Sequence, residues 1–406
     1  MKCGKLTCLA FVVVVLVLAF VVLPFATGYA QTKSSEATLD IGLLFGLTGF
    51  ISSRDLPDYN ETLIAADVLN ERGGITVKGQ KYKFRMVAED TKSTMDGVAS
   101  AANRLAFDKK VKFVIGPLDF FAPAANQVLN PAKVLRVLHW SGISPGEVDS
   151  STPYTFLGGN ATVANALTVV KYLKKAYPNV KKIAFVTPDD GSVPYLFPAI
   201  KGLLESNGIT VVGDAIAFAN EAQDYSPISA KINAVKEADA AAQFNGHLPQ
   251  ICGIVKGLRQ LGNTKPYYAA VPTAMSEIVP IIGKTAAKDV ITNSISYDDP
   301  SIPPIAKEIC DKTVAKYGKE YSLYLNGAQS LYALKVAIEA AQSFDTTVVK
   351  TKWESMTKMD TLFGPGNVGG KKTFGINHVV THPQVVQVLK NGVVTSAGWF
   401  DTGMIP

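Results

Sequence analysis

From residue 38 onward, the pattern of apolar and polar positions predicts alternating strands and helices. Apolar residues alternate over 39–45 as in a strand, and a helix expected from about residue 60 ends at Gly73-Gly74. Further strands are expected at 82–88, 111–115, 134–138, 182–187, 210–213, 240–244 and 267–270, with helical stretches between them. Strands alternating with helices indicate mostly parallel sheets, here as two doubly wound α/β sets that separate near residue 160.

Ligands of open parallel sheets bind beyond the carboxyl ends of the strands. We therefore expect the chemistry of this protein in the loops that follow Phe45, Ile115, Leu138, Thr187, Phe244 and Ala270. With two such sets of strands, these loops can face one another across a cleft.

The first thirty residues read as a secretory signal peptide. Lys2 and Lys5 precede an apolar run from Leu9 to Leu23, and small residues follow up to Ala30. The run is shorter than the roughly 20 residues that span a bilayer, so cleavage after Ala30 is favoured over a retained anchor. Removing the signal leaves a net charge of about +4, too mild to indicate a nucleic-acid partner.

Two cysteines, Cys252 and Cys310, remain in the mature chain. They could pair in an oxidising compartment, but two buried, unpaired thiols are the favoured interpretation.

Motifs that resemble enzyme sites each lack a necessary part. Gly142 to Gly146 match the G-x-S-x-G elbow of serine hydrolases, yet Pro145 has no N–H for the oxyanion hole. Residues 364–369 match G-x-G-x-x-G without a preceding strand, and Gly283-Lys284-Thr285 lacks the first glycine of a phosphate loop. We expect no enzyme and no cofactor.

His378 and His382 have the i, i+4 spacing of metal ligands. Val379 and Val380 between them favour a strand, on which that spacing does not form a metal site. We interpret the two histidines as surface or turn residues and expect no metal.

Several segments in order resemble the type I periplasmic binding proteins of branched-chain amino acid ABC importers. They are DIGLLFGLTG at 40–49, LNERGGI at 69–75, Asp90, Val114-Ile115-Gly116 and WSGISPGE at 140–147. The resemblance implies two lobes joined by a three-crossover hinge, with lobe I at 38–158 plus 290–362 and lobe II at 159–289 plus 363–406. Hinge closure around a ligand would then create the form that the importer recognises.

The resemblance also implies binding residues in the first lobe. Arg54 stands where an aromatic contact is common, and it either binds a ligand carboxylate or is a plain exposed arginine. Phe120 stands where a serine usually binds the ligand carboxylate, which removes a hydroxyl and adds an apolar wall, and Phe121 also lines the cleft. Gly142 and Ser144 match the carbonyl and hydroxyl that contact an amino acid, with a simple turn role as the alternative.

In the second lobe the resemblance places Ser192, His247 and Thr273 at the ligand, although His247 could equally be a structural residue. A carboxylate that usually receives the ammonium of an amino acid is replaced by Val271, Pro272 and Thr273. An unpaired ammonium in a cleft would cost several kcal/mol. The expected ligand is therefore a small carboxylate or aromatic acid.

The sequence thus predicts a periplasmic, monomeric solute-binding protein that works with the permease and ATPase subunits of an ABC importer. One alternative is that it binds a branched-chain or other amino acid, or an amide. Another is the ligand-sensing domain of a receptor or regulator, which would need a further membrane or signalling segment after Pro406.

Overall fold

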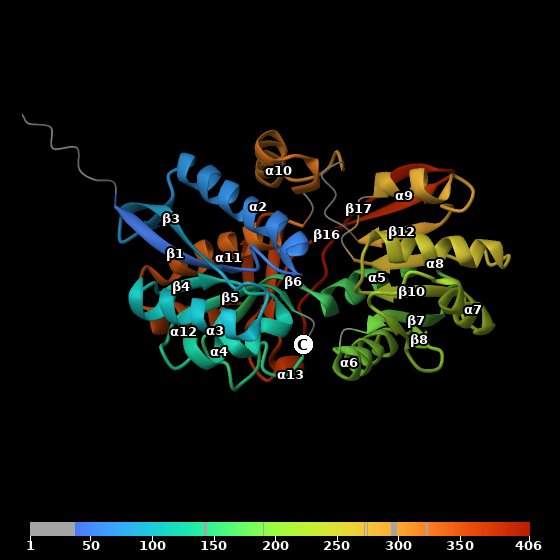
Figure 1. The fold of residues 1–406 in the computed structure, drawn as a ribbon, viewed down its shortest axis with the longest axis horizontal. Helices are drawn as coiled ribbons and strands as arrows, with labels where there is room; N and C mark the ends of the chain where they lie inside the picture. The colour runs from blue at the N-terminus through green and yellow to red at the C-terminus, as the bar shows by residue number, and fades with distance from the viewer. Residues whose placement is uncertain are drawn as a thin grey trace, which may run out of the picture. The chain divides into compact units, whose positions relative to one another are not determined.

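The computed structural model describes residues 37–141, 144–189, 191–271, 273, 275–293, 299–321 and 324–406. Thr38–Pro406 form one compact unit, built from two β-sheets with helices on both faces (Figure 1). The expected signal peptide and Gly142 lie outside the described residues.

The first sheet has the order β13-β14-β15-β6-β5-β4-β1-β3-β2. Its strands are β1 (Thr38–Phe45), β2 (Ile75–Val77), β3 (Gln80–Asp90), β4 (Phe113–Ile115), β5 (Leu135–Ser141), β6 (Thr155–Ala161), β13 (Lys358–Thr361), β14 (Gly364–Gly369) and β15 (Val379–Thr381). The central pairs β1 with β3, β1 with β4, β4 with β5 and β5 with β6 are parallel. Their carboxyl ends therefore meet at one edge of the sheet.

The second sheet has the order β17-β16-β12-β11-β10-β7-β8, and β9 also pairs with β7. Its strands are β7 (Lys182–Asp189), β8 (Thr210–Val211), β9 (Ile216–Ala219), β10 (Ala240–Phe244), β11 (Tyr267–Ala270), β12 (Val290–Asn293), β16 (Gln384–Lys390) and β17 (Val393–Phe400). The pairs among β7, β10, β11 and β12 are parallel, whereas β16 and β17 form an antiparallel hairpin.

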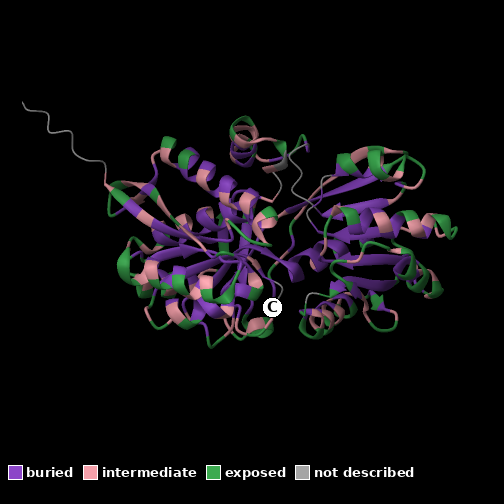
Figure 2. Ribbon diagram, in the orientation of Figure 1, coloured by how far each residue is buried: buried purple, intermediate pink, exposed green. Residues whose placement is uncertain are grey.

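Alternating side chains of each central strand pack against helices on opposite faces. Ile41, Leu43 and Phe45 belong to one buried cluster, and Leu44 belongs to another. The helices around the first sheet are α2 (Ser52–Glu71), α3 (Met95–Asn103), α4 (Ala122–Leu129), α10 (Pro304–Tyr317), α11 (Asn326–Ala341), α12 (Thr346–Glu354) and α13 (Lys371–Phe374). Those around the second are α5 (Thr162–Ala176), α6 (Val193–Ser206), α7 (Ser226–Ala234), α8 (Leu248–Gln260) and α9 (Met275–Ile282). Figure 2 shows buried strands between helices whose outer faces are exposed.

Two strands lie in sheets other than those the expected lobe boundaries assign. The boundary at 290 placed β12 in the first lobe, but β12 pairs with β11 and β16 in the second sheet. The boundary at 363 placed β14 in the second lobe, but β14 pairs with β13 and β15 in the first sheet. The chain therefore passes between the sheets after β6, after β12 and after β15, because sheet pairing continues beyond the expected breaks.

The interpretation of His378 and His382 as surface or turn residues was wrong. Both are buried, with exposed fractions of 0% and 3%. His378 Nδ1 lies 2.7 Å from the Thr155 carbonyl oxygen and Nε2 lies 2.7 Å from Glu354, so two polar partners make its burial tolerable. The strand expected between the two histidines is present as β15.

Cys252 and Cys310 are both buried. Cys252 lies in α8 beside the second sheet and Cys310 lies in α10 beside the first. Burial raises the pKa of the Cys252 thiol to about 11, which keeps it protonated and unreactive at neutral pH.

Candidate functional site

The loops after β1, β4 and β5 lie at the carboxyl edge of the first sheet, and the expected residues Arg54, Phe120, Phe121 and Ser144 lie in them or directly after them. The loop after β1 is held by Asp90 at the end of β3, which accepts hydrogen bonds from the backbone of Leu47 and from the Thr48 hydroxyl, the latter at 2.6 Å. Burial opposes the charge of Asp90, but these hydrogen bonds keep its pKa below the usual range. Asp90 therefore fixes the loop that leads into α2.

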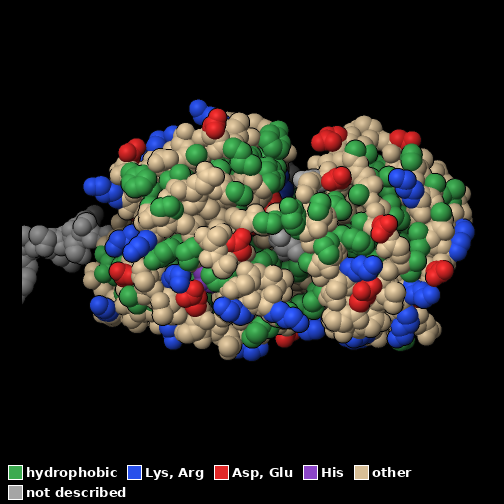
Figure 3. All heavy atoms as spheres, turned by 90° about the horizontal axis from the view of Figure 1, so that it is seen from below, with side chains coloured by type: hydrophobic (Ala, Val, Ile, Leu, Met, Phe, Trp, Pro, Cys, Tyr) green, Lys and Arg blue, Asp and Glu red, His purple; other side chains and the backbone are tan. Residues whose placement is uncertain are grey.

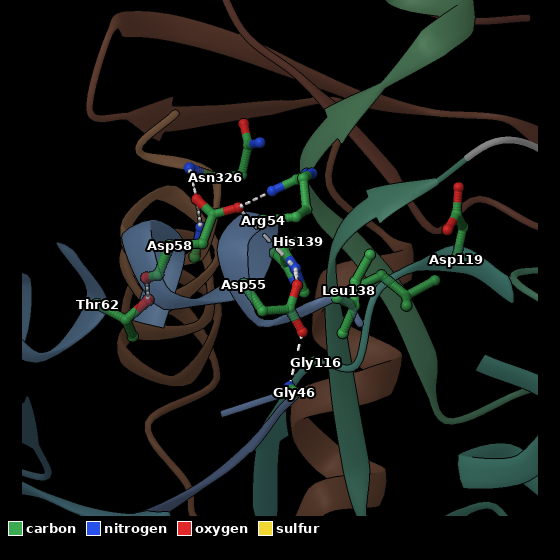
Figure 4. Close-up of polar contacts among 12 residues, drawn as sticks. Gly46, Arg54, Asp55, Asp58, Thr62, Gly116, Asp119, Leu138, His139 and Asn326 are labelled. Carbon is green, nitrogen blue, oxygen red and sulfur yellow. Dashed lines mark hydrogen bonds and ion pairs between the residues drawn. The ribbon is translucent and has the colours of Figure 1, made fainter. Parts of the chain in front are cut away.

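Arg54 lies in the first turns of α2, and Figure 4 shows its guanidinium paired with Asp58. Nη1 donates to Asp58 Oδ2 at 2.8 Å, and the guanidinium carbon lies 5.1 Å from the Trp140 ring centre and 4.6 Å from that of Tyr324. The side chain remains 24% exposed. Nη2, however, is buried and finds no acceptor among the described residues.

Asp55, Asp58 and Glu61 are carboxylates of α2 that are fully buried. Asp55 accepts from the Gly46 backbone N–H at 2.8 Å, Asp58 from that of Asn326 at 3.0 Å, and Glu61 from that of Leu325 at 2.7 Å. Leu325 precedes α11 in a left-handed conformation and cannot cap this helix with an apolar side chain. Asp58 and Glu61 therefore cap the amino terminus of α11 from a neighbouring helix, whereas Asp55 holds the loop after β1.

His139 of β5 lies between two of these acids. Its ring stacks on Phe45 with centres 4.8 Å apart, and its Nε2 lies 3.7 Å from Asp55 Oδ1 and 4.0 Å from Asp58 Oδ2. Neither ring nitrogen makes a hydrogen bond within the described part of the chain. Arg54 stays positively charged in this setting. Desolvation opposes its charge, but Asp58, Tyr324 and Asp55 together raise its pKa above the ordinary value.

Aromatic rings from two of the loops form a second feature of this edge. Phe120 and Phe121 have ring centres 4.4 Å apart, and Phe50 of the loop after β1 lies 6.2 Å from Phe120. Phe50 is 72% exposed and Phe120 is 40% exposed. The sequence interpretation missed Phe50, which is the only aromatic residue of the loop between β1 and α2.

Beneath these loops lies a buried polar network centred on Arg136 of β5. Arg136 donates to Asn126 Oδ1 at 2.7 Å and lies 3.5 Å from the Gly116 carbonyl oxygen, and burial lowers its pKa to about 9. Asn126 in turn donates to the Gly146 carbonyl at 2.6 Å. The network therefore joins the loop after β4 to the loop after β5.

Ser144 contributes through its backbone N–H, which donates to Glu147 Oε1 at 2.9 Å. Glu147 also accepts from the Ser141 hydroxyl at 2.7 Å and is 2% exposed. The carboxylate thus shapes the turn that carries Ser144, whose side chain is half-buried.

In the second sheet, the expected residues lie in the loops at the carboxyl ends of β7, β10 and β11. Ser192 is buried just before α6, and His247 is exposed just before α8, where its N–H donates to Gln250. Thr273 is buried and its hydroxyl contacts the Val271 carbonyl at 3.3 Å. Glu277, the nearest acid along the chain, lies in α9 and is exposed.

Two further features of the described residues bear on other interpretations. No three His, Cys, Asp or Glu side chains gather closely enough to hold a metal ion there. No helix of that part is both long and apolar enough to cross a membrane.

Comparison with known proteins gives consistent matches. A family model described as periplasmic binding protein matches residues 38–392. The Leu/Ile/Val-binding protein BraC3 of Rhizobium johnstonii is 26% identical over 338 residues, which cover 82% of this chain and 88% of that protein.

Solved structures share the fold. The leucine-binding protein LivK of Thermotoga maritima has a TM-score of 0.66 and 22% identity, covering 90% of this chain and 99% of its own. A solute-binding protein of R. palustris in complex with 4-hydroxybenzoate has a TM-score of 0.67 and 19% identity, covering 90% and 97%.

Proposed function

The chain belongs to the periplasmic binding protein family, and from this premise we propose that it captures a small solute for an ABC importer. The carboxyl-edge loops of both sheets would contact the solute, and the closed form would present it to the permease. The name of the Rhizobium relative supports transport of the branched-chain amino acid type.

The ligand that fits this chain best is a small carboxylic acid, with an aromatic or apolar body. Arg54 Nη2 carries this proposal, since it is a buried donor of a charged group that lacks an acceptor. Leaving such a donor unpaired costs about 1–3 kcal/mol, which a ligand carboxylate would recover. Phe50 and Phe120 offer exposed rings for the rest of the molecule.

A branched-chain amino acid is the competing ligand, favoured by the name of the Rhizobium relative. Its ammonium would need an acceptor, and the described residues of the loop after β11, Val271 and Thr273, carry no carboxylate. Asp55 and Asp58 are fully buried and already accept backbone or guanidinium donors, whereas Asp55 Oδ1 has no hydrogen-bond partner among the described residues.

Calorimetric titration of Arg54 variants tests the proposal. Arg54→Ala should weaken binding of a carboxylic acid by about 10- to 100-fold, as expected for one charge-assisted hydrogen bond, while Arg54→Lys should lose less. Arg72→Ala, which removes an exposed arginine at the end of the same helix, is the matched control. Equal affinities in Arg54→Ala and the parent protein would remove Arg54 from the site.

We also propose that the protein is exported and cleaved after Ala30. The signal-like pattern of residues 1–30 and the family's periplasmic setting support this. Mass spectrometry of the secreted protein would show an amino terminus at Gln31, whereas an intact amino terminus would indicate a retained anchor.

A further inference from the structure

A basic groove lies at the far end of the second sheet from the ligand loops. It has a volume of about 730 Å³, and the basic residues that line it are Lys256, Arg259, Lys284 and Lys288. None of the described residues that line it is acidic. The ends of α8 and α9 form its walls, next to the starts of β11 and β12, whereas the ligand loops follow the other ends of these strands.

Arg259 gives the groove a fixed base. Its guanidinium donates to the carbonyl oxygens of Asn263 at 2.7 Å, Lys288 at 2.9 Å and Ala286 at 3.2 Å. These bonds tie the end of α8 to the segment before β12. Because the guanidinium of Arg259 is hydrogen-bonded to backbone carbonyl groups, the charges that a partner can contact are those of the lysines.

Lys256, Lys284 and Lys288 are exposed and make no ion pair within the described part of the chain. The face of the molecule in Figure 3 shows basic and acidic side chains interspersed. A groove lined by lysines without a carboxylate is therefore a local concentration of positive charge on a surface of mixed sign.

Exposed apolar residues stand next in the chain to residues that line the groove or contact its lysines. Leu261 directly follows α8 and is 49% exposed, and Ile281, near the end of α9, is 52% exposed. Val393, the first residue of β17 after the turn that follows β16, is 63% exposed. That turn lies against Lys284, because a Cβ on Gly392 would come within 2.5 Å of the lysine stem.

We propose that this basic groove and its apolar border dock on the surface of a membrane rich in anionic phospholipids. Lysines on flexible stems suit many phosphate headgroups at once, and each adds attraction that salt screens. The apolar side chains can enter the interface between headgroups and acyl chains. Binding of a soluble phosphate does not require three exposed apolar residues beside the groove, whereas binding to a membrane surface buries them.

The location agrees with such a surface. It lies at the opposite ends of the strands from the ligand loops, so a docked molecule keeps those loops uncovered. The inference uses the proposed export, which places the protein beside a membrane, and is independent of which solute is bound.

Sedimentation of the mature chain, residues 31–406, with lipid vesicles tests the proposal. We expect binding to phosphatidylglycerol-containing vesicles, little binding to pure phosphatidylcholine vesicles, and loss of binding at high salt. The triple variant Lys256→Glu, Lys284→Glu, Lys288→Glu should bind the anionic vesicles about tenfold more weakly or worse. The same charge change at the exposed Lys352, Lys371 and Lys372, on α12 and α13, should leave binding unchanged.

A second set of variants separates a membrane from a soluble phosphate. Leu261→Ser, Ile281→Ser and Val393→Ser together should weaken vesicle binding while keeping its salt dependence. Absence of binding to anionic vesicles would overturn the proposal, as would equal losses in the two lysine variants. Competition by millimolar pyrophosphate with no effect of the serine variants would likewise overturn it. Solute affinity, measured on the same variants, should not change, so failure here leaves the proposed transport function standing.

Discussion

At the scale of single residues, the carboxylates of α2 determine how Arg54 is presented. Asp58 holds one terminal nitrogen of the guanidinium and also accepts the backbone N–H groups at the start of α11. Because Asp58 is fully buried, its charge is tolerable only with these donors. The other terminal nitrogen, Nη2, is the one that we propose binds a ligand carboxylate.

Asp58→Asn should lower the free energy of unfolding by about 2 kcal/mol, because the variant loses a charged acceptor for a helix start and a buried ion pair. Chemical denaturation measures this change. Asp67→Asn, on the exposed face of the same helix, is the control and should change stability by less than about 0.5 kcal/mol. Equal effects of the two substitutions would contradict the capping role of Asp58.

His382 should make the protein sensitive to mild acid. Burial lowers the pKa of His382 from 6.5 to about 4. The unfolded chain therefore binds a proton more readily than the folded protein, and stability falls as the pH decreases from about 6.5 to about 4. The loss from this residue is about 3 kcal/mol.

Denaturation of His382→Gln at pH 7 and pH 4 measures this contribution. The variant should lose less stability between the two pH values than the parent protein, even if it is less stable at pH 7. A pH dependence identical to that of the parent would show that another group causes the acid sensitivity.

At the scale of elements, the buried polar network centred on Arg136, which joins the loops after β4 and β5, should contribute to both stability and solute binding. Asn126→Ala removes the acceptor of Arg136 and the donor to Gly146, so we expect a loss of about 3 kcal/mol in stability. Weaker solute binding should accompany it, because both loops carry site residues. Asn103→Ala, in which only a local helix contact is lost, should change neither property. Unchanged solute affinity in a folded Asn126→Ala protein would show that this network does not position the binding residues.

Helices and strands with a regular spacing of apolar residues were predictable, and those with buried polar residues were not. The expected strand at 240–244 is β10, and the expected strand at 267–270 is β11. The start of α2 was placed eight residues too late, because Pro57 and the acids before residue 60 look like a solvated loop. These acids are buried since distant backbone N–H groups bind them, and a local pattern cannot show that.

The site was predictable only as far as the loops that carry it. Parallel strands indicate which loops meet, and Arg54, Phe120, Phe121 and Ser144 lie in or beside those loops as expected. The pairing of Arg54 with Trp140 and Tyr324 joins segments far apart in the sequence. No spacing along the chain indicates such a contact.

At the scale of the whole molecule, sheet pairing decides which segments form each lobe. Strand β12 belongs to the second sheet, and β14 and β15 belong to the first, so the chain crosses between the sheets after β6, β12 and β15 and not at the expected boundaries. Gln384, at the start of β16, donates a hydrogen bond to Asn165 at 2.7 Å and accepts one from Asn293 at 2.8 Å. One buried side-chain amide therefore connects α5, the end of β12 and the start of β16. The apolar pattern alone showed two sets of strands but not the points of exchange.

The most direct test of the central claim is thermal unfolding of the mature protein, first unfolded and refolded to remove bound solute, with matched pairs of small molecules. Each pair contains a carboxylic acid and its amide, and leucine and isoleucine form a separate arm. A ligand at 100 times its dissociation constant adds about 2.7 kcal/mol to stability. Stabilisation by an aromatic or aliphatic acid, absent with its amide and with both amino acids, is the predicted result. Stabilisation by leucine or isoleucine alone would contradict the assignment of Arg54 and the missing ammonium acceptor to an acid-binding site.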